Sequence, residues 1–154
     1  MPQLYYDVSN TFIYTGQKIP KQIRSYITKI IIDDSVTSIG NYAFEYCSSL
    51  ESISIPDSVT SIGYGAFEGC SSLTSVKIGN SVISIGISAF AYCASLASIT
   101  IPDNVTSIGI MAFYDCSSLK DVYFTGTEEQ WNKISISFAN DDLLNANIHF
   151  NSRG

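Results

Sequence analysis

The four cysteines are the residues of this chain whose type first suggests chemistry, because clustered thiols bind zinc or form disulfides. They stand at Cys47, Cys70, Cys93 and Cys116, each 23 residues after the one before. A zinc site gathers its ligands around one point, whereas a fixed interval of this length predicts one thiol per repeat, stacked in a column. We therefore interpret the cysteines as a buried ladder of reduced thiols. Partial oxidation and a metal site are the alternatives.

The other residue types that carry chemistry give no catalytic pattern. His149 is the only histidine, and its place near the C-terminus is typical of a cap residue. Asp33, Asp34, Asp57 and Asp103 fall at predicted strand ends, where aspartate commonly stabilises turns; a calcium site is the alternative. The glycines are spread by the repeat and form no phosphate-binding loop. We predict that the chain is not an enzyme and carries no metal or cofactor.

Apolar residues keep the same interval as the cysteines, so the cysteines are one position of a longer repeat. Alanine, isoleucine and glycine recur in this way, and so does phenylalanine, at Phe44, Phe67, Phe90 and Phe113. A period of about 20–50 residues is the signature of a solenoid, in which each repeat forms one coil. The pattern therefore predicts a repeat solenoid, and it moves the functional question from a pocket to a surface.

Each repeat contains the signals for three short elements. In the unit 50–72, the pattern L-x-x-I-x-I alternates and predicts a strand with its apolar side chains inward. Pro56 ends that strand, and V-T-S-I-G predicts a second, shorter strand. A-F-x-x-C predicts one short helical turn whose Ala66, Phe67 and Cys70 face the core. Equivalent strands of successive coils should pair in parallel about 4.8 Å apart.

The repeat boundaries divide the chain into three parts, because an open solenoid needs a cap at each end. We predict an N-terminal cap at 1–26, the repeats at 27–124 and a C-terminal cap at 125–154. The repeats run over 27–49, 50–72, 73–95 and 96–118, and a final strand follows at 119–124.

Both predicted caps contain local signals. In the first cap, Leu4–Val8 and Thr11–Tyr14 predict a hairpin. In the second, Thr127 predicts a helix start with Gln130 as its capping-box partner. The side chains of Trp131 and Ile134 are expected to cover the last coil. A helical turn at 141–146 and a closing strand at 147–150 are expected to complete this cap.

The whole repeat, L-x-x-I-x-I-P-x-S-V-T-x-I-G-x-x-A-F-x-x-C-S-S, resembles the BspA-type leucine-rich repeat family over residues 27–124. The segment 123–131 also resembles the C-terminal end of that family. The resemblance implies a right-handed leucine-rich coil with a parallel β-sheet on one face. A short second β-ladder and short helical turns are expected on the other. The family resemblance also implies a function, because members of this family are surface adhesins that bind host proteins and are often secreted or held on the cell surface.

Composition and charge exclude other classes of protein. The chain has 154 residues, of which 45% are hydrophobic and 14% charged, as in a globular domain. Its net charge of −6 and its scattered lysines and arginines argue against nucleic acid as a partner. No apolar run approaches the roughly 20 residues that membrane insertion requires. The N-terminus has no basic segment followed by an apolar stretch, so no signal peptide is expected, and the localisation stays open.

The positions that vary between repeats are the best candidates for a binding surface. They carry an unusual number of tyrosines and isoleucines, and we expect these to be at least partly exposed along one side of the solenoid. The alternative is that they pack sideways on neighbouring coils. The candidate residues are Tyr42, Tyr46, Tyr64, Ile87, Tyr92, Ile110 and Tyr114. The outward face of the longer strands is the other regular surface, but it is mostly serine and threonine.

These observations predict a non-catalytic module for protein–protein recognition, adhesin-like by its family resemblance. The alternative is a structural or assembly subunit, such as a component of a virion or a surface lattice, that associates with itself through its sides or edges. The sequence names neither the protein partner nor the oligomeric state.

Overall fold

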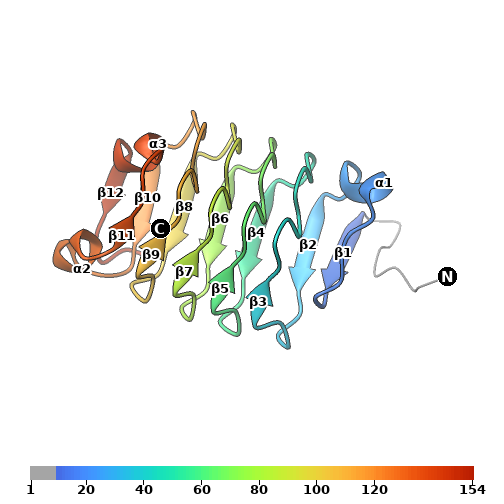
Figure 1. Ribbon diagram of the computed structural model, residues 1–154, viewed down its shortest axis with the longest axis horizontal. Helices are drawn as coiled ribbons and strands as arrows, with labels where there is room; N and C mark the ends of the chain where they lie inside the picture. Colours follow the sequence, from blue (N-terminus) through green and yellow to red (C-terminus); the bar gives the residue numbers. More distant parts are fainter. Residues whose placement is uncertain (1–9) are drawn as a thin grey trace.

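The computed structural model describes residues 10–154, which form a solenoid of coils stacked side by side (Figure 1). The predicted repeat solenoid is confirmed. The longer strands are β1 (Thr11–Tyr14), β2 (Lys29–Ile32), β4 (Ser52–Ile55), β6 (Ser75–Ile78), β8 (Ser98–Ile101), β10 (Asp121–Phe124) and β12 (Asn147–His149). The two-residue strands are β3 (Ser38–Ile39), β5 (Ser61–Ile62), β7 (Ser84–Ile85), β9 (Ser107–Ile108) and β11 (Ser135–Ile136). Three short helices, α1 (Lys21–Arg24), α2 (Glu128–Asn132) and α3 (Asp141–Leu144), lie toward the ends of the described residues.

The strands pair in parallel with the register that the repeat predicts. One sheet has the order β12-β10-β8-β6-β4, and a second has the order β11-β9-β7-β5-β3. Ser52 lies opposite Ser75, its equivalent one repeat later. Within β4 and β6, exposed and buried residues alternate, as expected for a strand with one face on the core.

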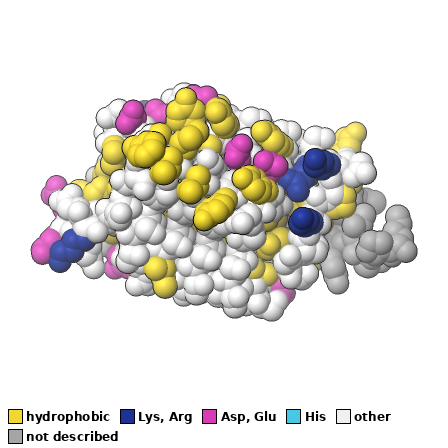
Figure 2. Space-filling model, in the orientation of Figure 1, with side chains coloured by type: hydrophobic (Ala, Val, Ile, Leu, Met, Phe, Trp, Pro, Cys, Tyr) yellow, Lys and Arg dark blue, Asp and Glu magenta, His cyan; other side chains and the backbone are white. Residues whose placement is uncertain are grey.

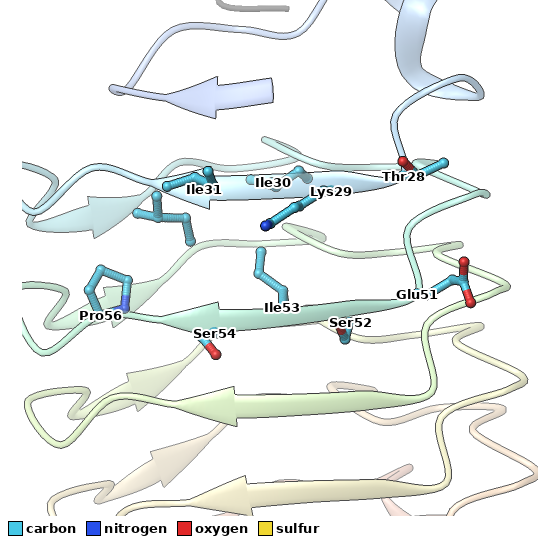
Figure 3. A pocket seen from close by; sticks show the side chains of 10 residues that line it. Thr28, Lys29, Ile30, Ile31, Glu51, Ser52, Ile53, Ser54 and Pro56 are labelled. Carbon is cyan, nitrogen blue, oxygen red and sulfur yellow. The ribbon is translucent and has the colours of Figure 1, made fainter. Parts of the chain in front are cut away.

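The sheet of longer strands is interrupted near the N-terminal end. Strands β1 and β2 form a separate two-stranded parallel sheet, and in the described residues no backbone ladder joins β2 to β4. The same coils remain joined on the next face, where β3 pairs with β5. The interruption leaves an open hollow of about 560 Å³ between β2 and β4, with Lys29 and Glu51 among its lining residues (Figure 3). Leu4–Val8, the other half of the predicted hairpin, lies outside the described residues.

A third backbone ladder runs along the segments where helical turns are expected. Each segment is a run of overlapping turns. In the first of these segments, for example, the N–H of Ala43 donates to the carbonyl of Gly40 over 3.2 Å. Positive φ angles of 58° at Tyr42 and 59° at Tyr46 prevent these turns from continuing as a helix. Between coils, the N–H of Phe44 donates to the carbonyl of Ala66 over 2.7 Å, and equivalent bonds follow at later coils.

The core is built from columns of identical side chains. Phe44, Phe67, Phe90 and Phe113 are fully buried, and neighbouring rings in this column are 5.1–5.3 Å apart at their centroids. The column brings apolar surface of each coil against the next, so most of the hydrophobic stabilisation belongs to contacts between coils.

The four cysteines are buried and free, and they form a second column in the core. The Sγ–H groups of Cys70 and Cys93 donate to the carbonyls of Phe44 and Phe67, each over 3.2 Å. Burial raises the pKa of Cys47 and of Cys93 to about 12, despite the nearby Arg24 in the first case and the hydrogen bond from the backbone of Cys70 in the second. Burial likewise raises the pKa of the other two thiols, so the protonated form is strongly favoured near neutral pH.

We expect the native protein to react with a thiolate-selective disulfide reagent at pH 8 at least about a hundredfold more slowly than an exposed cysteine. The thiolate is the reactive form, and its fraction falls about tenfold for each unit by which the pKa rises. The measurement is the rate of thiol modification before and after denaturation, with Ala94→Cys as the control, because Ala94 is exposed beside Cys93. Fast modification of the native chain, or fewer than four thiols in a fresh unreduced and denatured sample, would contradict a reduced buried ladder.

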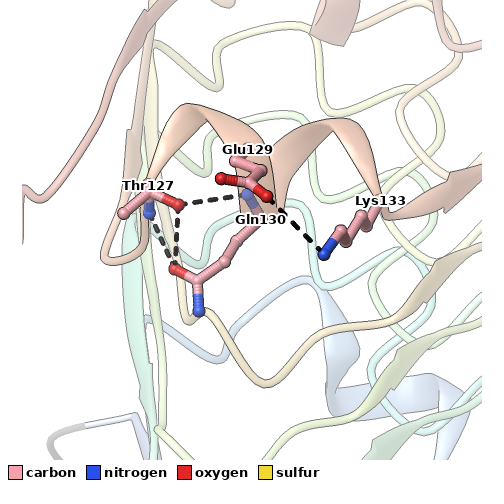
Figure 4. A network of polar contacts seen from close by, with 4 residues as sticks. All are labelled: Thr127, Glu129, Gln130 and Lys133. Atoms are coloured by element: carbon pink, nitrogen blue, oxygen red, sulfur yellow. Dashed lines mark hydrogen bonds and ion pairs between the residues drawn. The ribbon is translucent and has the colours of Figure 1, made fainter.

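The C-terminal end closes the stack as the sequence predicts. The hydroxyl of Thr127 accepts from the N–H of Gln130 over 3.1 Å, and the Gln130 side chain accepts from the N–H of Thr127 over 2.8 Å, which completes a capping box on α2 (Figure 4). Trp131 and Ile134 are buried, and the Trp131 ring lies 5.1 Å from that of Phe124. Helix α3 and strand β12 follow, and β12 pairs with β10.

Asn140 terminates the third ladder. It is the one polar residue that is buried within the described part of the chain. Its Oδ1 accepts from the N–H of Phe113 over 3.0 Å, whereas the equivalent N–H groups of earlier coils donate to a backbone carbonyl. Its Nδ2 donates to the carbonyls of Gly109 and Ser137, over 3.0 and 2.9 Å. The amide therefore satisfies buried groups at the edge of the last coil.

Candidate protein-binding surface

The residues that could carry chemistry are engaged in local structural contacts. His149 contacts Asp121 over 2.9 Å and stacks on Tyr123 at 4.9 Å, at the end of the sheet. The carboxylate of Asp33 accepts from the hydroxyl and the N–H of Ser35, and these hydrogen bonds lower the pKa of Asp33. Residues 10–154 contain no group of three metal-ligating side chains close enough to hold an ion. Within the same range, each helix is too short or too polar to cross a bilayer.

The seven variable residues identified in the sequence lie on the side of the solenoid that carries the third ladder. We call this set the tyrosine band: Tyr42, Tyr46, Tyr64, Ile87, Tyr92, Ile110 and Tyr114. Six of its side chains are between 42% and 57% exposed, and Ile110 is partly buried. Figure 2 shows hydrophobic side chains gathered on one face over several successive coils. The band thus presents apolar and aromatic side chains to solvent along several successive coils.

The backbone of the turns determines how the tyrosines of the band lie. Tyr42 and Tyr46 both have positive φ angles, and the ring of each covers the glycine that occupies its own position in the next coil. A side chain at Gly65 would collide with the Tyr42 ring, and one at Gly69 with the Tyr46 ring. Each ring therefore packs against a neighbouring coil on one side and remains open to solvent on the other. Both sequence interpretations, sideways packing and exposure, describe part of the arrangement.

Phe138 extends the band toward the C-terminus and is 74% exposed. Its carbonyl accepts from the N–H of Met111 over 3.2 Å, in the place where the carbonyl of Ile110 accepts from the N–H of Ser88 one coil earlier. Phe138 thus continues the row of Ile87 and Ile110. It follows Ile110 by 28 residues instead of 23, so the regular interval gives no signal for it.

The band ends in two hollows of opposite charge. At its N-terminal end, Tyr42 borders a hollow of about 600 Å³, which we call the basic hollow; its cationic residues are Lys18, Lys21 and Arg24. At its C-terminal end, Tyr114 borders a hollow of about 270 Å³, which we call the acidic hollow; its carboxylates are Asp115, Asp141 and Asp142. Figure 2 shows Lys and Arg side chains near the N-terminal end of the hydrophobic surface, with Asp or Glu side chains beside them, and further Asp and Glu side chains at the opposite end. In residues 10–154, none of these six forms an ion pair.

The guanidinium of Arg24 is held in place, whereas the two lysines beside it are exposed. Its Nε donates to the carbonyl of Ile19 over 3.1 Å, and its Nη1 donates to the carbonyl of Glu45 over 2.6 Å. In the turns that carry the band, burial and then the charge of Glu45 raise the pKa of Glu68. A raised pKa means that the ionised form of Glu68 is less favoured here than in water. A partner that covers this carboxyl group therefore loses less free energy than it would by covering a fully hydrated carboxylate.

The outward face of the longer strands offers weaker anchors. Its exposed residues are mainly serine and threonine, with Ile31 45% exposed near its N-terminal end and Tyr123 partly buried near the other. Aromatic and apolar anchors provide most of the energy of protein interfaces, so the tyrosine band is the stronger candidate.

Comparison with known proteins gives a family match over most of the chain. Residues 21–145 match the family described as the BspA type leucine rich repeat region, with six copies. The sequence pattern alone separates four near-complete copies, because the copies at the two ends depart from the regular interval. No curated protein matches the chain.

Several solved structures of bacterial proteins are similar to this one. A leucine rich cell surface protein from Faecalibacterium prausnitzii is 32% identical, with a TM-score of 0.56 over 84% of this chain and 35% of that one. A leucine-rich repeat protein from Bacteroides capillosus is 29% identical, with a TM-score of 0.53 over 77% of this chain and 78% of that one. Another from Eubacterium ventriosum shares the fold at 21% identity, with a TM-score of 0.57, and covers 87% of this chain and 41% of that one. The chain thus spans about a third of the Faecalibacterium protein.

Proposed function

Because this chain belongs to the BspA type leucine rich repeat family, we propose that it is a non-catalytic module that binds another protein through the tyrosine band. The observation that supports this choice of surface is the set of six side chains of the band that are at least 42% exposed while their backbone is fixed by the third ladder. Rigid, half-buried aromatic rings lose little conformational entropy on binding, which favours them as interface anchors.

The proposed binding is adhesin-like. Leucine-rich repeat families are suited to protein–protein interaction, and the similar Faecalibacterium protein is a cell surface protein. We propose recognition of a protein on another cell, with the tyrosine band as the contact surface and no part for a metal or cofactor.

Replacing Tyr42, Tyr46 and Tyr92 by serine is expected to reduce capture of a partner at least about tenfold. A tyrosine at the centre of an interface commonly contributes about 1–2 kcal/mol or more, so three together give an effect of this size or larger. Serine is compatible with the local backbone, because Ser88 occupies the position of Tyr42 in a later coil with a φ of 58°. The measurement is quantitative mass spectrometry of cell-surface proteins retained on the immobilised chain.

The matched control is a triple variant of the strand face, Lys29→Ser, Ile31→Ser and Tyr123→Ser, which is expected to retain the same partner as the unmodified chain. Circular dichroism and the melting temperature would verify that both variants are folded. Loss of capture in the strand-face variant, with full capture in the tyrosine variant, would place the binding surface on the outward face of the longer strands and not on the tyrosine band.

A further inference from the structure

We propose that the tyrosine band pairs with the same band of a second copy of this chain, with the two copies antiparallel. This inference rests on the proposed function, because it uses the same surface: a second copy would cover the tyrosine band whenever no protein of another cell occupies it. The partner is inferred from the charges at the two ends of the band, which make the surface complementary to itself after a rotation of 180°.

The basic and acidic hollows provide that complementarity. The basic hollow has three cationic side chains against the single carboxylate of Glu45, and the acidic hollow has three carboxylates and no cation. None of the three cations and none of the three aspartates has an ion-pair partner within residues 10–154. A two-fold axis through the middle of the band would place the basic hollow of each copy over the acidic hollow of the other, twice in one dimer. A parallel arrangement would instead bring like charges together, which opposes association.

The centre of the band suits a contact between identical surfaces. Tyr64 and Ile87 lie in adjacent coils near its middle, and both are exposed. Around a two-fold axis, these two residues of one copy would meet the same two residues of the other. Ring faces and aliphatic side chains would then be covered while the charged groups remain at the rim.

The overall charge makes the effect of salt informative. Each copy has a net charge of −6, so two copies repel at long range and we expect a weak dimer. If attraction between the two hollows holds the dimer, added salt screens it and weakens association. If apolar contact alone held the copies together against their net repulsion, added salt would strengthen association.

The test is sedimentation equilibrium of the full chain from micromolar to millimolar concentration, at low and at high salt. We expect a monomer–dimer equilibrium that weakens as salt is added. Two variants reverse the ends of the band: Lys18→Glu with Lys21→Glu makes both ends acidic, and Asp141→Lys with Asp142→Lys makes both basic. Each variant alone should dimerise at least about tenfold more weakly. A mixture of the two should form a heterodimer again, since acidic ends then face basic ends.

The control for charge reversal is Glu128→Lys with Glu129→Lys, which changes the net charge by the same amount as the aspartate variant but lies on α2, outside the band. It should leave dimerisation in place. Should a reversed variant fail to fold, Lys18→Gln with Lys21→Gln and Asp141→Asn with Asp142→Asn remove the same charges and should still weaken the dimer.

Any of the following would overturn the pairing: a monomer at all concentrations, association that strengthens with salt, or a mixture of the reversed variants that stays monomeric. A monomeric chain that still captures a partner through its tyrosines would overturn the pairing and leave the proposed function standing. A dimer that survives in the reversed variants would also overturn it, because self-association would then use another surface.

Discussion

Phe90→Ala is expected to lower the free energy of unfolding by about 3–5 kcal/mol, because it opens a cavity in the middle of the coil stack. The Phe90 ring is fully buried, and its centroid lies 5.1 Å from that of Phe67 and 5.3 Å from that of Phe113. Hydrogen-bonded ladders on three sides hold the adjacent coils at a fixed spacing. The neighbours therefore have little freedom to collapse into the space that the ring leaves.

The measurement is chemical denaturation of the purified variant, with Phe138→Ala as the matched control. Both substitutions remove the same atoms, but Phe138 is 74% exposed, so its loss should cost less than about 1 kcal/mol. If the two variants were destabilised to the same extent, the column of phenylalanines would not be the main source of stability in the core.

The effect of Phe90→Ala should also spread beyond its own coil. In a solenoid, each repeat is stabilised mainly by its contacts with the two neighbours. Hydrogen exchange of backbone amides should therefore quicken in the coils that contain Phe67 and Phe113 as well. Protection lost only in the coil of Phe90 would show that the coils are stable independently of one another.

The regular interval explains why the centre of this fold is predictable from sequence. A residue type that recurs every 23 positions must occupy equivalent places in successive coils, so parallel register and inward columns follow directly. Ser52 opposite Ser75 is one outcome of that rule, and the column of buried cysteines is another. The capping box of Thr127 was predictable for a different reason, since it depends only on residues three positions apart.

The features that escaped prediction depend on backbone geometry or on a change of interval. Tyrosine itself gives no signal of the positive φ angles at Tyr42 and Tyr46; the signal was the glycine that takes the place of each in the next coil, at 65 and 69. The third ladder and the interruption between β2 and β4 likewise involve backbone groups that every residue possesses. The candidate surface was predictable as a set of variable positions. Its charged ends and Phe138 lie largely in segments that do not follow the 23-residue interval.

Asn140→Asp is the second substitution expected to have a large effect, with a loss of about 3–5 kcal/mol in the free energy of unfolding at pH 7. The new carboxylate could still accept from the N–H of Phe113, but it would have no hydrogens to donate. The carbonyls of Gly109 and Ser137, now 3.0 and 2.9 Å from Nδ2, would lose their donor and face a buried negative charge.

The loss should depend on pH in a direction that identifies its cause. Burial without a cation raises the pKa of the new carboxyl group in the folded state above the unfolded value of about 3.9. The protonated form has one hydrogen to donate, so the variant should be least destabilised near pH 4 and lose further stability as the pH rises through the folded-state pKa. Denaturation at pH 4 and pH 7 measures this difference, and Asn145→Asp, at an exposed site beyond α3, is the control that should show little change at either pH. An equal loss at both values would mean that the charge of the carboxylate is not responsible, and that the hydrogen bonds donated by the Asn140 amide account for the loss.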